Sequence, residues 1–342
     1  MKRSVMVFGL VLSAVFTLSA GGRQEPPPSE LFSIGVFVPG VVEGSPTYEM
    51  LVAGVERAVA ETARATMRVI EGGFNQAQWE QTVVSMAATG DYDLIVTSNP
   101  EMPDVVRAVL GSFPTQRFLI LDAHLADNPV VHTVMFNQRE QAFLAGHFAA
   151  LVSTSPMVEP RSRLRAGLLA GQEYPIMNDV ILPSFELGLR SVDPDATVDF
   201  RVLGNWFDAG RASELANSMF ATGSDVVLTI AGGGNQGVIA AARDRRRFVL
   251  WYDTPGYSQA PGIVIGSTFV ALDRAAFERT VAAIDGTLEY GRADILGVAD
   301  GYVGFVEDDP LFRRHVDSSV RDALRRMVER FESGEFSLDV RF

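Results

Sequence analysis

Aromatic side chains occur in short segments that lie between apolar runs of the chain. Tyr48 and Tyr174 each follow such a run, and Trp206 lies in a polar, Gly-flanked segment. Rings placed outside an apolar core are suited to stacking on a planar ligand, so these three residues indicate a small-molecule site. Trp251 lies inside an apolar run, where a ligand contact and core packing are equal alternatives.

Hydrogen-bonding residues come directly after several apolar runs. Asn99, Asp122 and Asp253 hold such positions, and their side chains can bind the amides or hydroxyls of a ligand. The alternative for Asp253 is a local Asx-turn or helix cap. Gly233 and Gly234 belong to a Gly-rich loop before a predicted helix, where N–H groups could meet a neutral polar ligand. An ordinary tight turn is the alternative there, because the loop lacks the Lys and Ser/Thr of a P-loop.

Signatures of catalysis do not accompany these residues. The four His form no metal-type pair at helical spacing, and the chain has no Gly-x-Ser-x-Gly or Walker-A sequence. With no Cys, thiolate metal sites, cysteine catalysis and disulfides are excluded. We therefore predict a binding protein rather than an enzyme, with no cofactor and no metal site. An enzyme that uses the Gly-rich loop on a nucleotide is disfavoured.

The composition of the chain also limits the classes of partner that we expect. The chain has 342 residues, a net charge of −13 and a pI of about 4.8. Nucleic-acid binding favours a basic face, so we expect no nucleic-acid partner. The Arg-rich stretch Arg243–Arg247 fits a solvated helix end, where cations complement the helix dipole.

The N-terminus indicates export. Lys2 and Arg3 precede an apolar run that is too short to span a bilayer, as in a signal peptide. We predict a signal peptide over 1–21 and a Pro-rich tether over 22–31. Leu18–Ala20 resembles the start of a lipobox, with Gly21 where the acylated Cys would stand. The expected location is periplasmic, with attachment to the cell membrane through a lipid if the native protein has that Cys.

The elements that must position the candidate residues alternate between strand and helix from Phe32 onward. Repeated β/α units predict doubly wound parallel sheets with helices on both faces, and ligands bind beyond the carboxyl ends of such strands. A Ser/Pro-rich break at 153–163 predicts two lobes. We assign 32–155 and about 264–305 to lobe 1, and 156–263 and about 306–342 to lobe 2. Phe269–Tyr290 is expected to be one helix.

Two segments resemble a known family. Phe136–Gly146 (FNQREQAFLAG) and Ala231–Ala241 (AGGGNQGVIAA) are similar to motifs of the basic-membrane-protein family, the purine-nucleoside-receptor type of binding lipoprotein. The similarity covers most of the chain from Phe32. It implies a type I periplasmic-binding-protein fold, a ligand held between two closing lobes, and an ABC permease as partner.

Departures from the nucleoside-binding pattern bear on the ligand. By resemblance, Trp206 stands for the stacking Phe of the second lobe, and Asp253 matches the ribose-binding Asp. The acidic loop of that pattern retains only Glu43, and Ser267–Ala271 lacks the expected Lys. The chain therefore most resembles the riboflavin-binding spirochaetal lipoproteins of the family. We predict riboflavin as the transported ligand, with a purine nucleoside as the alternative.

The predicted riboflavin site uses both lobes. The isoalloxazine would stack on Trp206 and Tyr48. Its uracil-like edge would meet Asn99 and the backbone of Gly232–Asn235. The ribityl chain would reach Asp253 or Asp122.

Overall fold

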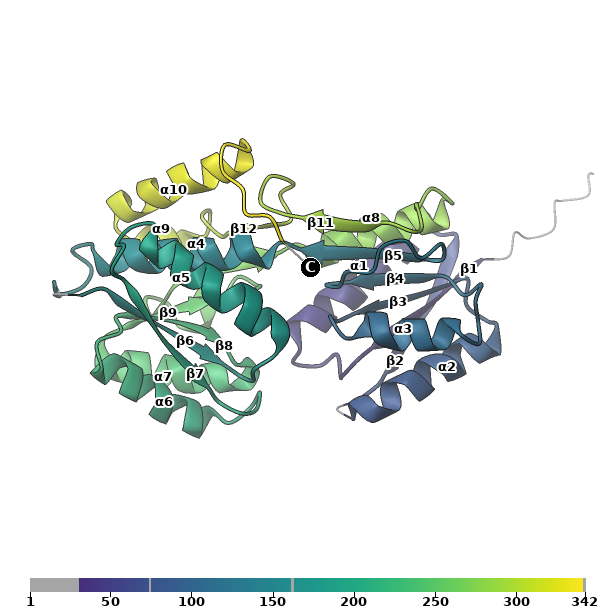
Figure 1. Ribbon diagram of the computed structural model, residues 1–342, viewed down its shortest axis with the longest axis horizontal. Coiled ribbons are helices and arrows are strands. Elements are labelled where there is room, and N and C mark those ends of the chain that lie inside the picture. Colours follow the sequence, from purple (N-terminus) through teal and green to yellow (C-terminus); the bar gives the residue numbers. More distant parts are fainter. Residues whose placement is uncertain (1–30, 74, 161–162, 341–342) are drawn as a thin grey trace, which may run out of the picture. The chain divides into compact units, whose positions relative to one another are not determined.

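The computed structural model describes residues 31–73, 75–160 and 163–340. The predicted signal peptide and all but the last residue of the predicted tether lie outside these ranges. The described chain contains two six-stranded sheets, each covered by helices (Figure 1). No helix within these ranges is long and apolar enough to cross a membrane.

The first sheet is parallel throughout and has the order β11-β5-β4-β3-β1-β2. Its strands are β1 (Phe32–Val38), β2 (Ala65–Glu71), β3 (Leu94–Ser98), β4 (Phe118–Leu121), β5 (Val131–Phe136) and β11 (Ala293–Leu296). Its helices are α1 (Pro46–Thr62), α2 (Trp79–Thr89), α3 (Met102–Leu110) and α8 (Leu272–Ile284), and the 3-10 turn η1 (Gln76–Gln78) precedes α2. Helix α1 packs against α8, and α2 packs against α3.

The second sheet has the order β12-β10-β9-β8-β6-β7, in which β12 runs antiparallel to β10. Its strands are β6 (Arg165–Ala170), β7 (Thr197–Val202), β8 (Val226–Ile230), β9 (Phe248–Trp251), β10 (Val264–Val270) and β12 (Val303–Phe305). Its helices are α4 (Gln138–Ser153), α5 (Leu182–Arg190), α6 (Ala209–Ala221), α7 (Asn235–Arg245), α9 (Pro310–His315) and α10 (Ser318–Glu332). Short turns are η2 (Met177–Ile181), η3 (Gly232–Gly234) and η4 (Tyr257–Gln259).

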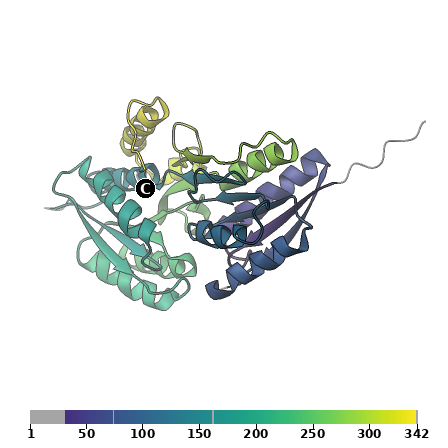
Figure 2. The same ribbon diagram turned by 45° about the vertical axis from the view of Figure 1, so that its right-hand side comes forward.

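Burial explains why these segments form central strands. All five residues of β3 and all four of β4 are buried, as expected where helices cover both faces. In β1, Val36 belongs to the core that includes α1, whereas Phe37 belongs to the core beneath α2 and α3. In the second lobe, α6 and α7 pack together, and α4 and α5 do likewise (Figures 1 and 2). The predicted doubly wound fold is confirmed.

The two lobes repeat one strand order. From one edge, the first reads β2-β1-β3-β4-β5 and the second reads β7-β6-β8-β9-β10. Strand β4 is therefore equivalent to β9, and β1 is equivalent to β6. Residues that follow equivalent strands hold matching positions in the two lobes, and this relation organises the candidate site.

Our predicted lobe boundary at 153–163 is wrong, because α4 packs in the second lobe against α5. The two helices approach closely through glycines. A Cβ on Gly146 would lie 2.0 Å from the Phe185 carbonyl oxygen, and one on Gly188 would lie 2.2 Å from that of Phe143. The first crossing between lobes is therefore at Asn137, between β5 and α4.

The other two predicted boundaries also shift. Strand β10 runs to Val270 within the second sheet, so the second crossing is at Ala271 rather than about 264. For the same reason the helix predicted over Phe269–Tyr290 begins only at Leu272. The third crossing lies between β11 and β12, before the expected 305. The error in the helix start concerns Phe269 and Val270, which are the last residues of β10.

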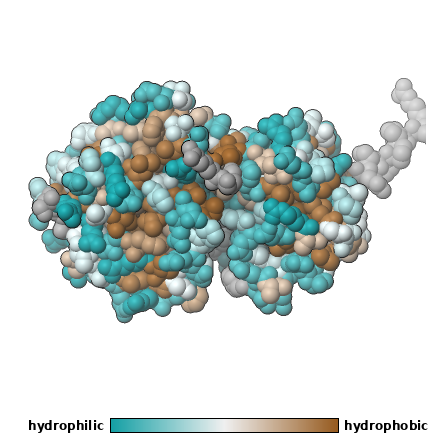
Figure 3. Space-filling view, in the orientation of Figure 1, coloured by the Kyte–Doolittle hydropathy of each residue, from teal (hydrophilic) through white to brown (hydrophobic). Residues whose placement is uncertain are grey.

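Hydrogen bonds link the crossings to one another. The Asn137 N–H donates to the Leu296 carbonyl at 2.8 Å, and the Ala271 N–H donates to that of Tyr302 at 2.8 Å. On the face of the molecule that Figure 3 shows, hydrophilic residues are interspersed with apolar patches on both lobes. Among the large apolar side chains that are exposed, Trp206 and Phe207 are adjacent.

Candidate ligand-binding site

Two aspartates stand at equivalent positions in the two lobes. Asp122 follows β4 directly, and Asp253 follows β9 after one intervening residue. Both have left-handed backbones, with φ of 54° and 67°, and Asn99 after β3 has φ of 144°. Asp and Asn tolerate positive φ better than other residues with a Cβ, and such conformations concentrate at ligand sites. Three strand ends thus present hydrogen-bonding side chains from an unusual backbone.

The carboxyl groups of this pair hold protons more tightly than usual. Burial and, to a smaller extent, the charge of Asp253 together raise the pKa of Asp122 to about 7. Burial also raises the pKa of Asp253 to about 6. Amide donors oppose these shifts: Gln138 bonds Asp122 and Gln141 bonds Asp253. Two like charges that sense one another in a partly desolvated space are typical of a functional site.

Tyrosines surround the aspartates. Burial raises the pKa of Tyr174, and the charges of Asp253 and Asp122 add to the shift. Burial likewise raises the pKa of Tyr48, whose hydroxyl donates to the Pro39 carbonyl at 2.9 Å. The Asn99 side-chain amide donates to that same hydroxyl at 3.4 Å. Tyr48 and Tyr174 follow the equivalent strands β1 and β6.

Trp206 lies against the end of β6 and keeps 41% of its area exposed. A Cβ on Gly171 would lie 2.3 Å from the Trp206 ring, so only glycine lets the indole approach the strand end. The ring of Tyr174 is 6.3 Å away, centroid to centroid, and inclined by 45°. The backbone carbonyl of Trp206 accepts the Gly233 N–H at 2.8 Å. The indole is thus fixed on one side and open on the other.

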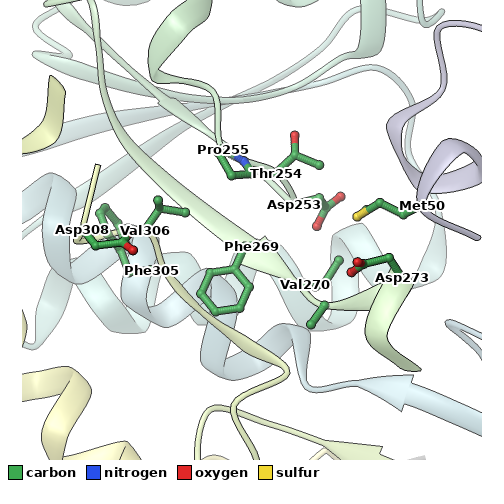
Figure 4. Close-up of a pocket in the computed structure, with 11 residues that line it drawn as sticks. Met50, Asp253, Thr254, Pro255, Phe269, Val270, Asp273, Phe305, Val306 and Asp308 are labelled. Atoms are coloured by element: carbon green, nitrogen blue, oxygen red, sulfur yellow. The ribbon is translucent and has the colours of Figure 1, made fainter. Parts of the chain in front are cut away.

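A cavity of about 500 Å³ adjoins Asp253 (Figure 4). Its size is within the range of small-molecule sites. Met50 enters it from α1 in the first lobe, and the side chains of Asp253 and Met50 point toward one another. The remaining lining residues are Asp273 of α8 in the first lobe, Ala271 at the crossing, and Thr254, Pro255, Phe269, Val270, Phe305, Val306 and Asp308 in the second lobe.

Comparisons with known proteins agree with this geometry. The family model described as "ABC transporter substrate-binding protein PnrA-like" matches residues 31–335. The chain belongs to this family. Basic membrane protein A of Borreliella burgdorferi is 22% identical over 94% of this chain and 92% of that protein. The ABC transporter nucleoside-binding protein BmpA of Lactococcus lactis is 28% identical over 49% of this chain and 46% of that protein.

The CD4+ T-cell-stimulating antigens of Listeria monocytogenes and Listeria innocua are matched over only 44% of their own length. Among solved structures, an ABC transporter solute-binding protein from Aeropyrum pernix has a TM-score of 0.75 at 20% identity, covering 90% of this chain and 93% of that one. That likeness shows the fold. The resemblance to the basic-membrane-protein family, inferred from the two sequence motifs, is confirmed.

Three predicted residues have other roles in the structure. The Trp251 ring covers Gly256, its indole N–H donates to the Thr254 hydroxyl at 3.2 Å, and it packs on the core beneath α6 and α7. Gly234 is buried in that lobe, and its N–H donates to the Ala231 carbonyl. The Gly233 N–H donates to the Trp206 carbonyl. Contrary to our expectation, the loop therefore uses both glycine N–H groups internally.

Sequence reasoning missed several residues at the site. Tyr252 is 7% exposed, and its hydroxyl has no hydrogen-bond partner among the described residues. Met50 and Phe269 line the cavity. Gln138 and Gln141 bond the two aspartates. Only the glutamines carried a signal, because they lie one helical turn apart in the first family motif.

The arrangement offers stacking surfaces and hydrogen-bond acceptors. No group of three or more His, Asp or Glu within the described ranges is arranged to hold a metal ion. The combination of rings and carboxylates suits a planar heterocycle that carries hydroxyl groups.

Proposed function

We propose that this family member is the extracytoplasmic receptor of an ABC importer and that its ligand is riboflavin. The observation that carries the proposal is the position of Trp206. Its indole rests on Gly171 beside Tyr174, whose hydroxyl senses the charges of Asp122 and Asp253, and it keeps 41% of its area open. An exposed ring fixed on one side is a ready stacking surface for an isoalloxazine.

The polar groups fit the ribityl chain. Its hydroxyls can donate to Asp253, which borders the cavity of about 500 Å³, and the unpartnered Tyr252 hydroxyl offers a further hydrogen bond nearby. Asp273 and Asp308 also line the cavity, and no Lys or Arg of the described residues does. Carboxylates without a cation favour a neutral hydroxylated chain and disfavour a phosphate. We therefore expect riboflavin to bind more tightly than its 5′-phosphate.

A purine nucleoside is the second candidate. The Lactococcus relative carries the name of a nucleoside-binding protein, and Asp253 could accept hydrogen bonds from a ribose as well as from a ribityl chain. The larger ring of riboflavin better matches a site with Trp206, Tyr174 and Tyr48. The absence of Lys from 267–271 also removes a cation expected for ribose in the nucleoside-binding pattern.

Titration decides between the two ligands. Riboflavin fluorescence is followed as ligand-free protein is added, and guanosine and inosine are titrated by calorimetry. Saturable quenching without nucleoside heat supports riboflavin. Binding heat from a nucleoside without quenching of riboflavin fluorescence supports the nucleoside as ligand. No signal in either assay refutes both ligands. Leu187→Ala, which removes a side chain of matched exposure (42%) on α5, should bind like the parent protein.

Location and partner complete the proposal. Residues 1–21 would direct export, and 22–31 would separate the receptor from the membrane. An ABC permease would accept the ligand from the two lobes. Replacing Gly21 by Cys should create an acylation site if the segment is a lipobox, and a shift of the protein into the membrane fraction would report it.

A further inference from the structure

The first turn of α4 contacts both aspartates of the site. The Gln138 side-chain amide donates to Asp122 Oδ1 at 3.2 Å. The Gln141 side-chain amide donates to Asp253 Oδ1 at 3.0 Å. Residues three apart lie on one face of a helix. One helical turn therefore holds the equivalent carboxylates of both lobes.

This turn is itself anchored at the crossings between lobes. Asn137 caps the helix by accepting the Glu140 N–H, and its side-chain amide donates to the Leu338 carbonyl at 2.9 Å. Glu140 is 6% exposed and accepts the Val298 N–H at 2.8 Å. These bonds tie the helix start to the third crossing and to the C-terminal segment. The two glutamines consequently extend from a fixed position.

The orientation of Gln141 carries a free-energy penalty. It is fully buried, and its amide nitrogen donates to both Asp253 and Thr268. The amide oxygen is left with no partner among the described residues. A buried acceptor without a hydrogen bond is unfavourable, and an apolar residue would avoid that penalty. The penalty therefore indicates that Gln141 serves as a hydrogen-bond donor and not as a packing residue.

We infer that Gln138 and Gln141 are positioning residues that hold Asp122 and Asp253, one in each lobe, in the orientation that meets the ligand. The inference rests on the proposed function only in taking the two aspartates as ligand-facing. Both glutamines lie within the first family motif. Neither belongs to the ligand-binding residues that we predicted from the sequence.

Other groups also face the two aspartates and act on their protonation. Asp122 senses the charge of Asp253, both charges act on Tyr174 and Tyr252, and the charge of Asp122 also acts on Tyr48. Asp273 and Asp308 share the cavity with Asp253. All of these neighbours are acidic or neutral. The glutamine amides are therefore the donors that favour the ionised carboxylates.

The test replaces each glutamine by Met, which has similar length and no donor, and uses Gln81→Met on the exposed face of α2 as the matched control. Carboxylate titration is followed by NMR in ligand-free protein with ¹³C-labelled Asp. Gln138→Met should raise the midpoint of Asp122, and Gln141→Met that of Asp253, each by roughly one pH unit. Affinity for riboflavin should fall roughly tenfold in each. Gln81→Met should change neither quantity.

The outcomes separate the alternatives. Unchanged midpoints overturn the inference, and so does an affinity loss without a midpoint shift, which indicates a direct ligand contact or a general structural effect. If Gln141→Met fails to fold, Gln138→Met still tests the inference, because Gln138 is only half-buried. In an Asp122→Asn background, Gln138→Met should have no further effect on affinity. If the parent protein binds neither riboflavin nor nucleoside, the proposed function fails while the midpoints still test the positioning role.

Discussion

Truncation of Trp206 tests the centre of the proposed site. Stacking of an aromatic side chain on a planar base contributes ~1–3 kcal/mol. Trp206→Ala should therefore weaken riboflavin binding by roughly ten- to a hundred-fold. Truncating a fully buried large aromatic residue costs ~3–5 kcal/mol of stability. Trp206 leaves 41% of its area exposed and packs mainly on Gly171 and Tyr174. We expect a stability loss of only about 1–2 kcal/mol.

A second variant moves the indole without deleting it. A Cβ on Gly171 would lie 2.3 Å from the Trp206 ring, and the backbone of Gly171 is otherwise compatible with Ala. Gly171→Ala should displace the ring and weaken binding in the same direction as Trp206→Ala. Leu187→Ala, of matched exposure, controls for the loss of an exposed apolar side chain.

The two quantities are measured on the same preparations. Fluorescence quenching gives the affinity, and urea unfolding of the ligand-free protein gives the free energy of unfolding. If Trp206→Ala lowers stability by several kcal/mol while the folded protein keeps its affinity, the ring is a packing residue and our site is misplaced. An unchanged affinity in Gly171→Ala would likewise contradict a stacking role that depends on ring position.

Three further predictions concern the fold and the aspartates. The contribution of the two aspartates to the free energy of unfolding of ligand-free protein should rise as pH is lowered from 8 to 5: the folded-state pKa of Asp122 is raised to about 7 and that of Asp253 to about 6, chiefly by burial, so the folded state binds protons that the unfolded state releases. An Asp122→Asn, Asp253→Asn double variant should flatten this dependence in urea titrations, and an unaltered slope would contradict the assignment. Glu140→Ala should lower the free energy of unfolding by about 2 kcal/mol, because the Val298 N–H loses its acceptor; Glu140→Gln, which keeps an acceptor, should lose less. Gly146→Ala should be strongly destabilising in thermal melts, since the Cβ would lie 2.0 Å from the Phe185 carbonyl oxygen, whereas Gly210→Ala on α6 meets nothing closer than 3.4 Å and should be mild.

Much of the fold follows from local patterns. Short apolar runs that alternate with helical periodicity predicted the strand and helix order, because a strand buried on both faces needs continuous apolar residues. The polar residues after β4 and β9 were found in the same way, since strand ends in a doubly wound sheet converge on the ligand. The two family motifs also stand in the sequence alone.

Lobe membership and ring exposure depend on distant partners. The small-residue face of α4 has no local property that selects a lobe, and the close packing of Gly146 against Phe185 decides it. Trp206 follows an apolar run and Trp251 lies inside one, and Gly171 leaves the first indole 41% exposed while Gly256 lies under the second. The bonds from Gln138 and Gln141 to aspartates of different lobes form only when both sheets are assembled. Periodicity therefore determined the elements, and tertiary packing decided which side chains meet, because those contacts join different elements that lie between 16 and 112 residues apart along the chain.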